Sequence, residues 1–126
     1  MAKTKRKIVL IVEDDEVLLR ALYLLFHNSG YTIASATDGD SALKMTERLH
    51  PDLVLLDLLL PKMNGFDVLR NIKVDPKIKD IPVIVLSNLG DQSDIDKAKT
   101  LGALDYYVKA NTELSSLEEK IKKILD

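Results

Sequence analysis

Five side chains with chemically useful groups fall at the ends of short apolar segments of this sequence. Glu13 and Asp14 follow one segment, Asp57 follows another, and Ser87 and Lys109 follow two more. Carboxylates that lie close together repel one another unless a proton or a cation compensates. Oxygen ligands without histidine or cysteine favour Mg²⁺ or a similar ion, which takes one or two carboxylates and fills its other positions with water and phosphate oxygens.

An aspartate beside a divalent cation, a lysine and a hydroxyl has the groups needed for phosphorylation of a carboxylate. A carboxylate can act as the nucleophile, and phosphoryl transfer depends mainly on positioning and on neutralising the equatorial oxygens. We expect Asp57 to attack, with the cation, Lys109 and Ser87 around the phosphoryl oxygens. Each residue alone is ordinary, because acidic residues and lysines at strand ends are often only solvated. The prediction rests on their combination.

Apolar blocks alternate with segments of helical spacing along the whole chain. Continuous apolar blocks of this length are typical of strands buried on both faces of a parallel sheet. The intervening segments carry apolar residues every three or four positions, most clearly between Leu114 and Leu125 and least clearly between Ser93 and Leu101. The predicted strands are Ile8–Val12, Thr32–Ala36, Leu53–Leu56, Val83–Leu86 and Leu104–Val108.

The residues that end and cap helices agree with five strand–helix units. Gly30 and Gly102 are placed to end helices, and Thr112 is a plausible N-cap for the last one. The units predict an α/β fold, a doubly wound parallel sheet with helices on both faces. Ligands of such sheets bind beyond the carboxyl ends of the strands, where the strand order reverses. We therefore expect the five polar side chains to meet at that edge.

Bulk properties favour one globular domain. The chain has 126 residues, a formal net charge of -2 and no cysteine. We expect a single domain over residues 1–126, with a basic tail at 1–6. The charge predicts no direct binding to nucleic acid, and no apolar run is long enough to insert into a membrane. Together with the lack of disulfides, these features favour a cytoplasmic location.

Four segments resemble, in combination, the receiver domains of two-component response regulators. They are Ile-Val-Glu-Asp-Asp at 11–15, Asp-Leu-Leu-Leu-Pro-Lys-Met-Asn-Gly at 57–65, Leu-Ser at 86–87 and Gly-Ala-Leu-Asp-Tyr-Tyr-Val-Lys at 102–109. The resemblance extends from about Lys7 to Leu125. It implies a flavodoxin-like five-stranded sheet with strand order 2-1-3-4-5.

The resemblance also implies a metal site and a phosphoacceptor. Asp57 takes the position of the phosphoacceptor, and Glu13 and Asp14 those of the metal-binding acidic pair. Asp57 and the backbone carbonyl of Leu59 would complete the protein ligands of Mg²⁺ or Mn²⁺.

Three further residues match the switch positions of the family. Ser87 stands at the switch hydroxyl, Tyr106 at the switch aromatic and Lys109 at the phosphate-pairing lysine. The implied mechanism moves Ser87 toward the phosphoryl oxygens and swings Tyr106 inward. Strand alternation turns Tyr107 to the opposite face, where we expect it only to pack.

The implied activity is signalling rather than enzymatic turnover. A sensor histidine kinase or a phosphotransfer protein would phosphorylate Asp57, and the face of the fourth helix, fifth strand and fifth helix would contact an unknown downstream protein. We expect only Mg²⁺-dependent self-phosphorylation and slow autodephosphorylation, in a monomer or a phosphorylation-dependent homodimer. Val17 and Leu24 lie off the core face of the first helix, and they make that helix a candidate docking surface for the kinase.

Some positions depart from the family pattern. Ala110 stands where a proline, often cis, usually follows the lysine, and a cis bond before alanine costs about 2.5–4 kcal/mol, so we expect a trans bond or strain. Asn88 could crowd the phosphoryl pocket. We hypothesise that Leu59 and Leu89 hinder the attacking water and slow loss of the phosphoryl group.

The alternative function is that of a pseudo-receiver, a binding module that works without phosphorylation. Ala110 and Asn88 leave it open, whereas the intact acidic set with Lys109 opposes it. Enzymes of similar fold fit worse. A haloacid-dehalogenase phosphatase would need an aspartate at Leu59, a flavodoxin a hydroxyl-rich loop at 13–15, and a dinucleotide-binding protein a G-x-G-x-x-G motif, which this sequence lacks.

Overall fold

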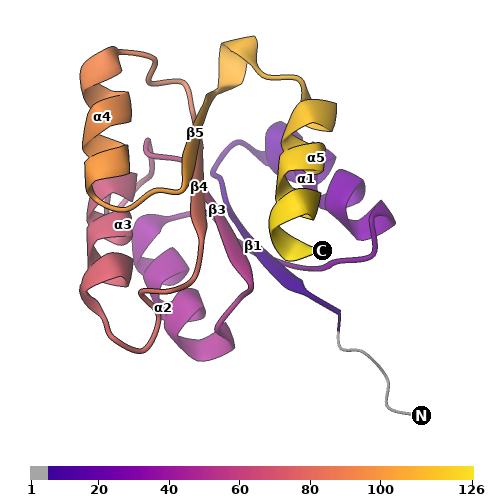
Figure 1. Ribbon diagram of the computed structural model, residues 1–126, viewed down its shortest axis with the longest axis horizontal. Helices are drawn as coiled ribbons and strands as arrows, with labels where there is room; N and C mark the ends of the chain where they lie inside the picture. Colours follow the sequence, from indigo (N-terminus) through magenta and orange to yellow (C-terminus); the bar gives the residue numbers. More distant parts are fainter. Residues whose placement is uncertain (1–5) are drawn as a thin grey trace.

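The computed structural model describes residues 6–126, in which a parallel sheet lies between two layers of helices (Figure 1). Helices α1 and α5 cover one face, and α2, α3 and α4 cover the other. The elements in chain order are β1 (Ile8–Val12), α1 (Glu16–Asn28), β2 (Thr32–Ala36), α2 (Gly39–Leu49), β3 (Leu53–Leu56), α3 (Gly65–Val74), β4 (Val83–Ser87), α4 (Gln92–Thr100), β5 (Asp105–Val108), a short 3₁₀ turn (Lys109–Asn111) and α5 (Leu114–Leu125).

The strand order confirms the predicted doubly wound topology. The five strands pair in parallel in the order β2-β1-β3-β4-β5, so the direction of winding reverses between β1 and β3. The β1–β3 pairing continues past the strands, where the Asp57 N–H donates to the Val12 carbonyl at 3.0 Å. This contact sets the residue after β3 beside the residues after β1, at the switch point of the sheet.

Strand β3 shows why the predicted strands are apolar without alternation. Val54 and Leu56 belong to the core under α2, α3 and α4, whereas Leu53 and Leu55 belong to the core under α1 and α5. All four side chains are buried. Because successive side chains of a strand point to opposite faces, a strand covered by helices on both sides must be apolar throughout.

The strands and glycine stops lie close to their predicted positions. Strand β4 extends one residue further than predicted and includes Ser87, while β5 begins at Asp105 rather than at Leu104. The side chain of Leu104 is 53% exposed. Gly30 and Gly102 follow their helices with φ angles of 93° and 112°, which confirms them as helix stops.

The prediction that Thr112 caps the last helix is wrong. Helix α5 begins at Leu114, and Glu113 is the residue that precedes it. The Thr112 hydroxyl instead donates to the carbonyl of Val108 at 2.7 Å. The Thr112 hydroxyl therefore donates to the end of β5 and accepts no hydrogen bond from the first turn of α5.

A close approach at Gly65 locks the loop that follows β3. The Gly65 N–H donates to the Leu58 carbonyl at 2.9 Å. A Cβ atom at this position would lie 2.4 Å from both the Asp57 carbonyl oxygen and the Leu58 Cα. Since both neighbours are backbone atoms, only glycine allows α3 to start directly against the segment that carries Asp57.

The expected basic tail, residues 1–6, lies outside the described residues except for Arg6. The Nε of Arg6 donates to the Gly30 carbonyl at 2.8 Å. Among residues 6–126, no helix has the length and apolar character needed to cross a membrane.

Candidate functional site

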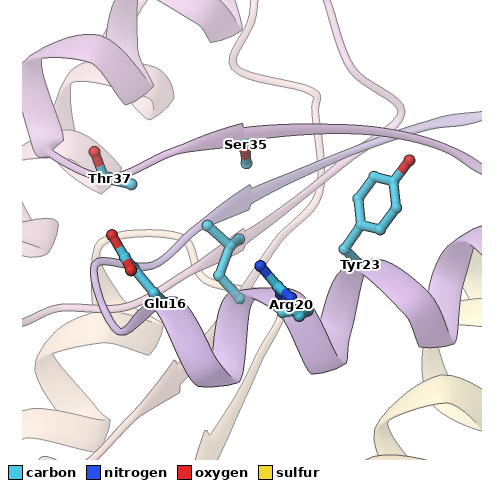
Figure 2. Close-up of a pocket in the computed structure, with 6 residues that line it drawn as sticks. Glu16, Arg20, Tyr23, Ser35 and Thr37 are labelled. Atoms are coloured by element: carbon cyan, nitrogen blue, oxygen red, sulfur yellow. The ribbon is translucent and has the colours of Figure 1, made fainter.

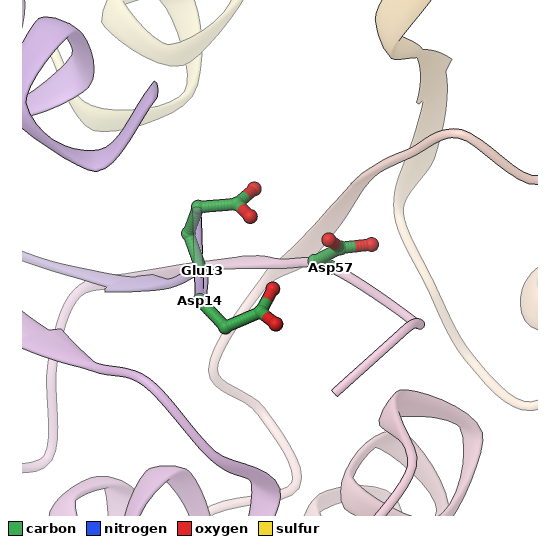
Figure 3. Close-up of side chains that lie close together, drawn as sticks. All are labelled: Glu13, Asp14 and Asp57. Atoms are coloured by element: carbon green, nitrogen blue, oxygen red, sulfur yellow. The ribbon is translucent and has the colours of Figure 1, made fainter. Parts of the chain in front are cut away.

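Three carboxylates meet at the carboxyl edge of the sheet (Figure 3). Ligand oxygens of Glu13, Asp14 and Asp57 lie within 4.8 Å of one another. Glu13 and Asp57 are buried, with 1% and 4% of their surface exposed, whereas Asp14 is exposed. Two of the three carboxylates are therefore buried in the fold and one faces solvent. This arrangement suits a cation that keeps part of its water shell.

Lys109 joins two of these carboxylates. Its Nζ lies 2.8 Å from Glu13 Oε1 and 2.8 Å from Asp57 Oδ2. With all four groups ionised, three carboxylates against one ammonium leave a net charge of -2. That excess suits a divalent cation, and the all-oxygen donor set fits Mg²⁺ or Mn²⁺.

For both Glu13 and Lys109, burial and the neighbouring charges have opposing effects on the pKa. Burial raises the pKa of the Glu13 carboxyl, and this effect outweighs the hydrogen bond from Lys109 and the one from the Asp15 N–H. Burial also disfavours the charged form of Lys109, but its hydrogen bonds to Asp57 and Glu13 outweigh this cost and raise the pKa of the ammonium group. Lys109 is therefore held in its charged form.

Asp15 positions the acidic pair, a role that the sequence reasoning missed. Its N–H donates to Glu13 Oε2 at 3.1 Å, and its own carboxylate caps α1 by accepting from Val17 N and Leu18 N. The signal was present, because an aspartate directly before a periodic apolar segment is a typical N-cap. The β1–α1 turn is thus fixed at both ends.

Asp57 has a different partner for each oxygen. Oδ2 accepts from Lys109, and Oδ1 accepts from the Leu59 N–H at 3.2 Å. The Leu59 peptide therefore lies beside the carboxylate, while its side chain is 50% exposed. The Leu59 carbonyl as a metal ligand stays a prediction.

Ser87 and Tyr106 meet at the loop between β4 and α4. The fully buried Ser87 hydroxyl accepts from the Leu89 N–H at 3.4 Å, and the Tyr106 hydroxyl donates to the Leu89 carbonyl at 2.5 Å. Burial, followed by the nearby charges of Asp94 and Asp57, raises the pKa of Tyr106. Tyr106 and Tyr107 pack on opposite faces of the sheet, as predicted.

The loop after β5 has no proline and no cis bond. Every peptide bond within residues 6–126 is trans, including the one between Lys109 and Ala110. The chain forms a 3₁₀ turn over Lys109–Asn111. The trans geometry expected from Ala110 is confirmed.

A separate hollow lies between α1 and the edge strand β2 (Figure 2). It has a volume of about 480 Å³ and contains no residue of the acidic cluster. The chemical groups of the site therefore lie at the sheet edge rather than in this hollow. Its lining residues are Glu16, Leu19, Arg20, Tyr23, Ser35 and Thr37.

The fold and the edge cluster together define a receiver-type α/β protein. The family described as response regulator receiver domain matches residues 9–122. The chain therefore belongs to the response regulator receiver family, whose members accept a phosphoryl group as their general function and generally bind Mg²⁺ or Mn²⁺.

Similar sequences support this assignment. The chain is 38% identical over 117 residues to ycf27 of Porphyridium aerugineum, a match that covers 93% of the chain and 47% of ycf27. It is 39% identical over 106 residues to the DNA-binding response regulator MtrA of Mycolicibacterium smegmatis, covering 84% of the chain and 45% of MtrA. The chain thus spans about half the length of these relatives.

Two solved structures are similar over most of their length. The phosphorylated cyanobacterial phytochrome response regulator RcpA has 34% sequence identity and a TM-score of 0.81, with 95% of this chain and 91% of that one covered. The Mn²⁺-bound form of response regulator Rcp1 has 29% identity and a TM-score of 0.78, with coverage of 94% and 88%.

Proposed function

We propose that Asp57 accepts a phosphoryl group from a sensor histidine kinase or a phosphotransfer protein and that this event switches the signalling state of the protein. The position of Asp57 is the observation that carries the proposal. Its buried carboxylate follows β3, lies within 4.8 Å of the acidic pair and accepts a hydrogen bond from Lys109. A structural ion pair would not require a third carboxylate, Asp14, at the exposed side of the same cluster.

In the transfer, an oxygen of Asp57 forms a bond to phosphorus while the bond from phosphorus to the donor's imidazole nitrogen breaks. Glu13, Asp14 and Asp57 would hold the Mg²⁺ or Mn²⁺ ion, which supplies positive charge to the phosphoryl oxygens. Lys109 already lies 2.8 Å from Asp57 Oδ2, so its ammonium can pair with the incoming group. The Ser87 hydroxyl can donate a hydrogen bond from the neighbouring strand.

We propose that the backbone of Leu89 links phosphorylation of Asp57 to a change in the shape of the protein. Ser87 accepts from the Leu89 N–H, and Tyr106 donates to the Leu89 carbonyl. A movement of Ser87 toward the phosphoryl group would break the first contact and shift the loop that leads into α4. The face formed by α4, β5 and α5 would then change shape and bind the downstream protein or a second copy of the chain. Tyr106 is bonded to the same loop, and in the proposed switch it would swing inward as the loop shifts.

The proposed donor docks on α1, and the phosphorylated state decays slowly. Val17 and Leu24 on α1 are 81% and 52% exposed, although both are apolar. Leu59 and Leu89 would limit access of water to the phosphoryl group, so we propose no catalytic turnover beyond self-phosphorylation and slow autodephosphorylation. On the strength of the family alone, we place this exchange in the cytoplasm.

The test is the intact mass of the protein after incubation with phosphoramidate or acetyl phosphate. We expect one hydroxylamine-labile phosphoryl adduct in the presence of Mg²⁺ and none with EDTA. Asp57→Asn should remove the adduct, whereas Asp40→Asn, in the first turn of α2 and away from the cluster of Glu13, Asp14 and Asp57, should retain it.

Failure of both small donors and of a histidine kinase to modify the protein would contradict the proposal. That outcome would favour the pseudo-receiver, which binds partners without phosphorylation. An adduct that persists in Asp57→Asn would assign the phosphoryl group to another residue.

A further inference from the structure

The loop that carries Lys109 has little intrinsic stiffness. Lys109 follows β5 and begins the 3₁₀ turn, and the next residue is Ala110. Proline would fix φ at this point, whereas alanine does not. The lysine side chain adds four rotatable carbons between the backbone and the ammonium. The ion pairs with Glu13 and Asp57 hold the ammonium itself, and contacts elsewhere in the loop set where the backbone of Lys109 lies.

Thr112 makes contacts on both sides of Lys109. Its hydroxyl donates to the carbonyl of Val108 at 2.7 Å, and its N–H donates to the carbonyl of Lys109 at 3.4 Å. The two bonds close the turn onto the end of β5. Thr112 itself is half-buried, so water competes only partly for the hydroxyl bond.

The Thr112 hydroxyl is not engaged in capping α5. That helix starts at Leu114 after Glu113, and no side chain accepts from its first N–H groups. A helix cap would explain a threonine here without any link to the site. The observed bond connects the threonine to the strand end that precedes Lys109 instead.

We propose that the Thr112 hydroxyl is a positioning group for phosphoryl acceptance. By closing the turn between Val108 and Thr112, it holds the Lys109 ammonium at 2.8 Å from Asp57 and Glu13. The effect of this placement on phosphorylation rests on the proposed function. The effect of Thr112 on the position of Lys109 does not depend on that function. Both hydrogen bonds of Thr112 are to backbone carbonyls, of Val108 and Lys109, so in this proposal Thr112 acts through the placement of Lys109.

The test compares Thr112→Val with Thr112→Ser. Valine has the shape of threonine without the hydroxyl. It also favours the extended backbone conformation of this residue, φ -113° and ψ 125°. Serine restores the hydroxyl. Thr46→Val is the matched control, because the Thr46 hydroxyl makes the same kind of bond, to the Ala42 carbonyl at 2.8 Å, inside the second half of α2.

The first measurement is the rate of phosphorylation by phosphoramidate with saturating Mg²⁺. We expect Thr112→Val to be roughly tenfold slower, since misplacing a catalytic group by 1 Å can cost about 100-fold. Thr112→Ser should remain near the wild-type rate, and so should Thr46→Val. A Thr112→Val rate equal to wild type would overturn the proposal, as would a Thr112→Ser rate as low as that of the valine variant or an equal loss in Thr46→Val.

The second measurement needs no phosphoryl donor. A crystal structure of Thr112→Val should show Lys109 displaced from Asp57 and Glu13. Unchanged contacts of 2.8 Å in that variant would overturn the positioning role. If the wild-type protein accepts no phosphoryl group, the proposed function fails, and this crystal structure alone decides the role of Thr112.

Discussion

The pKa values of several side chains in this protein depend on burial as well as on neighbouring charged groups. Tyr31, directly before β2, is the clearest case outside the acidic cluster. Burial, then the charge and hydrogen bond of Asp126 and the charge of Glu118, raise the pKa of Tyr31 to about 12. Its hydroxyl lies 3.2 Å from Asp126 Oδ1, and its ring packs near Phe26. The side chain thus fastens the end of α5 to the start of β2.

This pKa predicts a loss of stability at high pH. The folded protein holds the Tyr31 proton more tightly than the unfolded chain, whose tyrosine titrates near 10. The contribution is therefore complete below pH 10 and is lost as the pH rises toward 12. We expect the free energy of unfolding to fall by about 2 kcal/mol over this range from Tyr31 alone, at about 1.4 kcal/mol per pKa unit.

Urea unfolding of wild type and Tyr31→Phe between pH 9 and 12 measures this loss. Phenylalanine keeps the ring contact with Phe26 but has no proton to lose. The variant should be less dependent on pH, so the two unfolding free energies converge as the pH rises. Parallel curves for the two proteins would contradict the assignment.

At the scale of elements, α1 combines a buried face with an exposed apolar one. Leu22 and Phe26 lie in the core, while Val17 and Leu24 face solvent and Tyr23 is 43% exposed. This exposed apolar surface is the one that we propose as the docking site for the phosphoryl donor. Helix α4 differs, because it buries only Ala98 and is held to α3 in part by Lys97 over the ring of Phe66, 4.3 Å from its centroid.

The proposed docking role of α1 predicts a defect that depends on the donor. Val17→Asp should slow phosphoryl transfer from a histidine kinase that phosphorylates the wild type by roughly tenfold, since a charge placed in an apolar contact costs more than 1 kcal/mol. Phosphorylation by phosphoramidate should be unchanged, because Asp57 and its neighbours are untouched. Rates with both donors measure the effect.

Val74→Asp is the matched control for this experiment. Val74 is 70% exposed at the end of α3, on the other side of the sheet. It should behave as the wild type with both donors. An equal effect of the two substitutions on the kinase reaction would argue against docking on α1.

The whole molecule concentrates negative charge at one edge of the sheet. Parallel strands direct their carboxyl ends to the same side, and the order reversal between β1 and β3 brings Glu13 and Asp14 to Asp57. The fold therefore works against like-charge repulsion until a cation binds. For this reason we expect cation binding at this cluster to be coupled to folding.

Mg²⁺ should consequently stabilise the fold. A ligand that binds only the folded state adds about 2.7 kcal/mol at 100 times its Kd. We expect the melting temperature to rise with MgCl₂ and to return on addition of EDTA. NaCl at equal ionic strength is the control for screening, and thermal unfolding measures both.

Asp14→Asn makes this prediction specific. The substitution removes one exposed carboxylate from the cluster, so the variant should respond less to Mg²⁺ and should be no less stable than wild type without it. An equal rise with NaCl, or an unchanged Mg²⁺ response in Asp14→Asn, would contradict a metal site formed by these residues.

The sequence by itself determined the strands and the side chains at their ends. Continuous apolar blocks such as Leu53–Leu56 reveal burial on both faces, because period and composition are local properties of the chain. Because Asp57 directly follows such a block, its place at the carboxyl end of a buried strand could be predicted without knowing which strands lie beside it. The meeting of Glu13, Asp14, Asp57 and Lys109 was predicted in the same way, from the shared edge of parallel strands.

The tertiary structure alone decided which partners the polar groups take. The Thr112 hydroxyl bonds to Val108 rather than capping α5, and the Tyr106 hydroxyl bonds to Leu89, 17 residues away in the chain. Lys109 bridges two carboxylates that are themselves far apart in sequence. A hydrogen bond needs its two atoms within about 3 Å, and that distance is set by strand register and loop closure rather than by residue type.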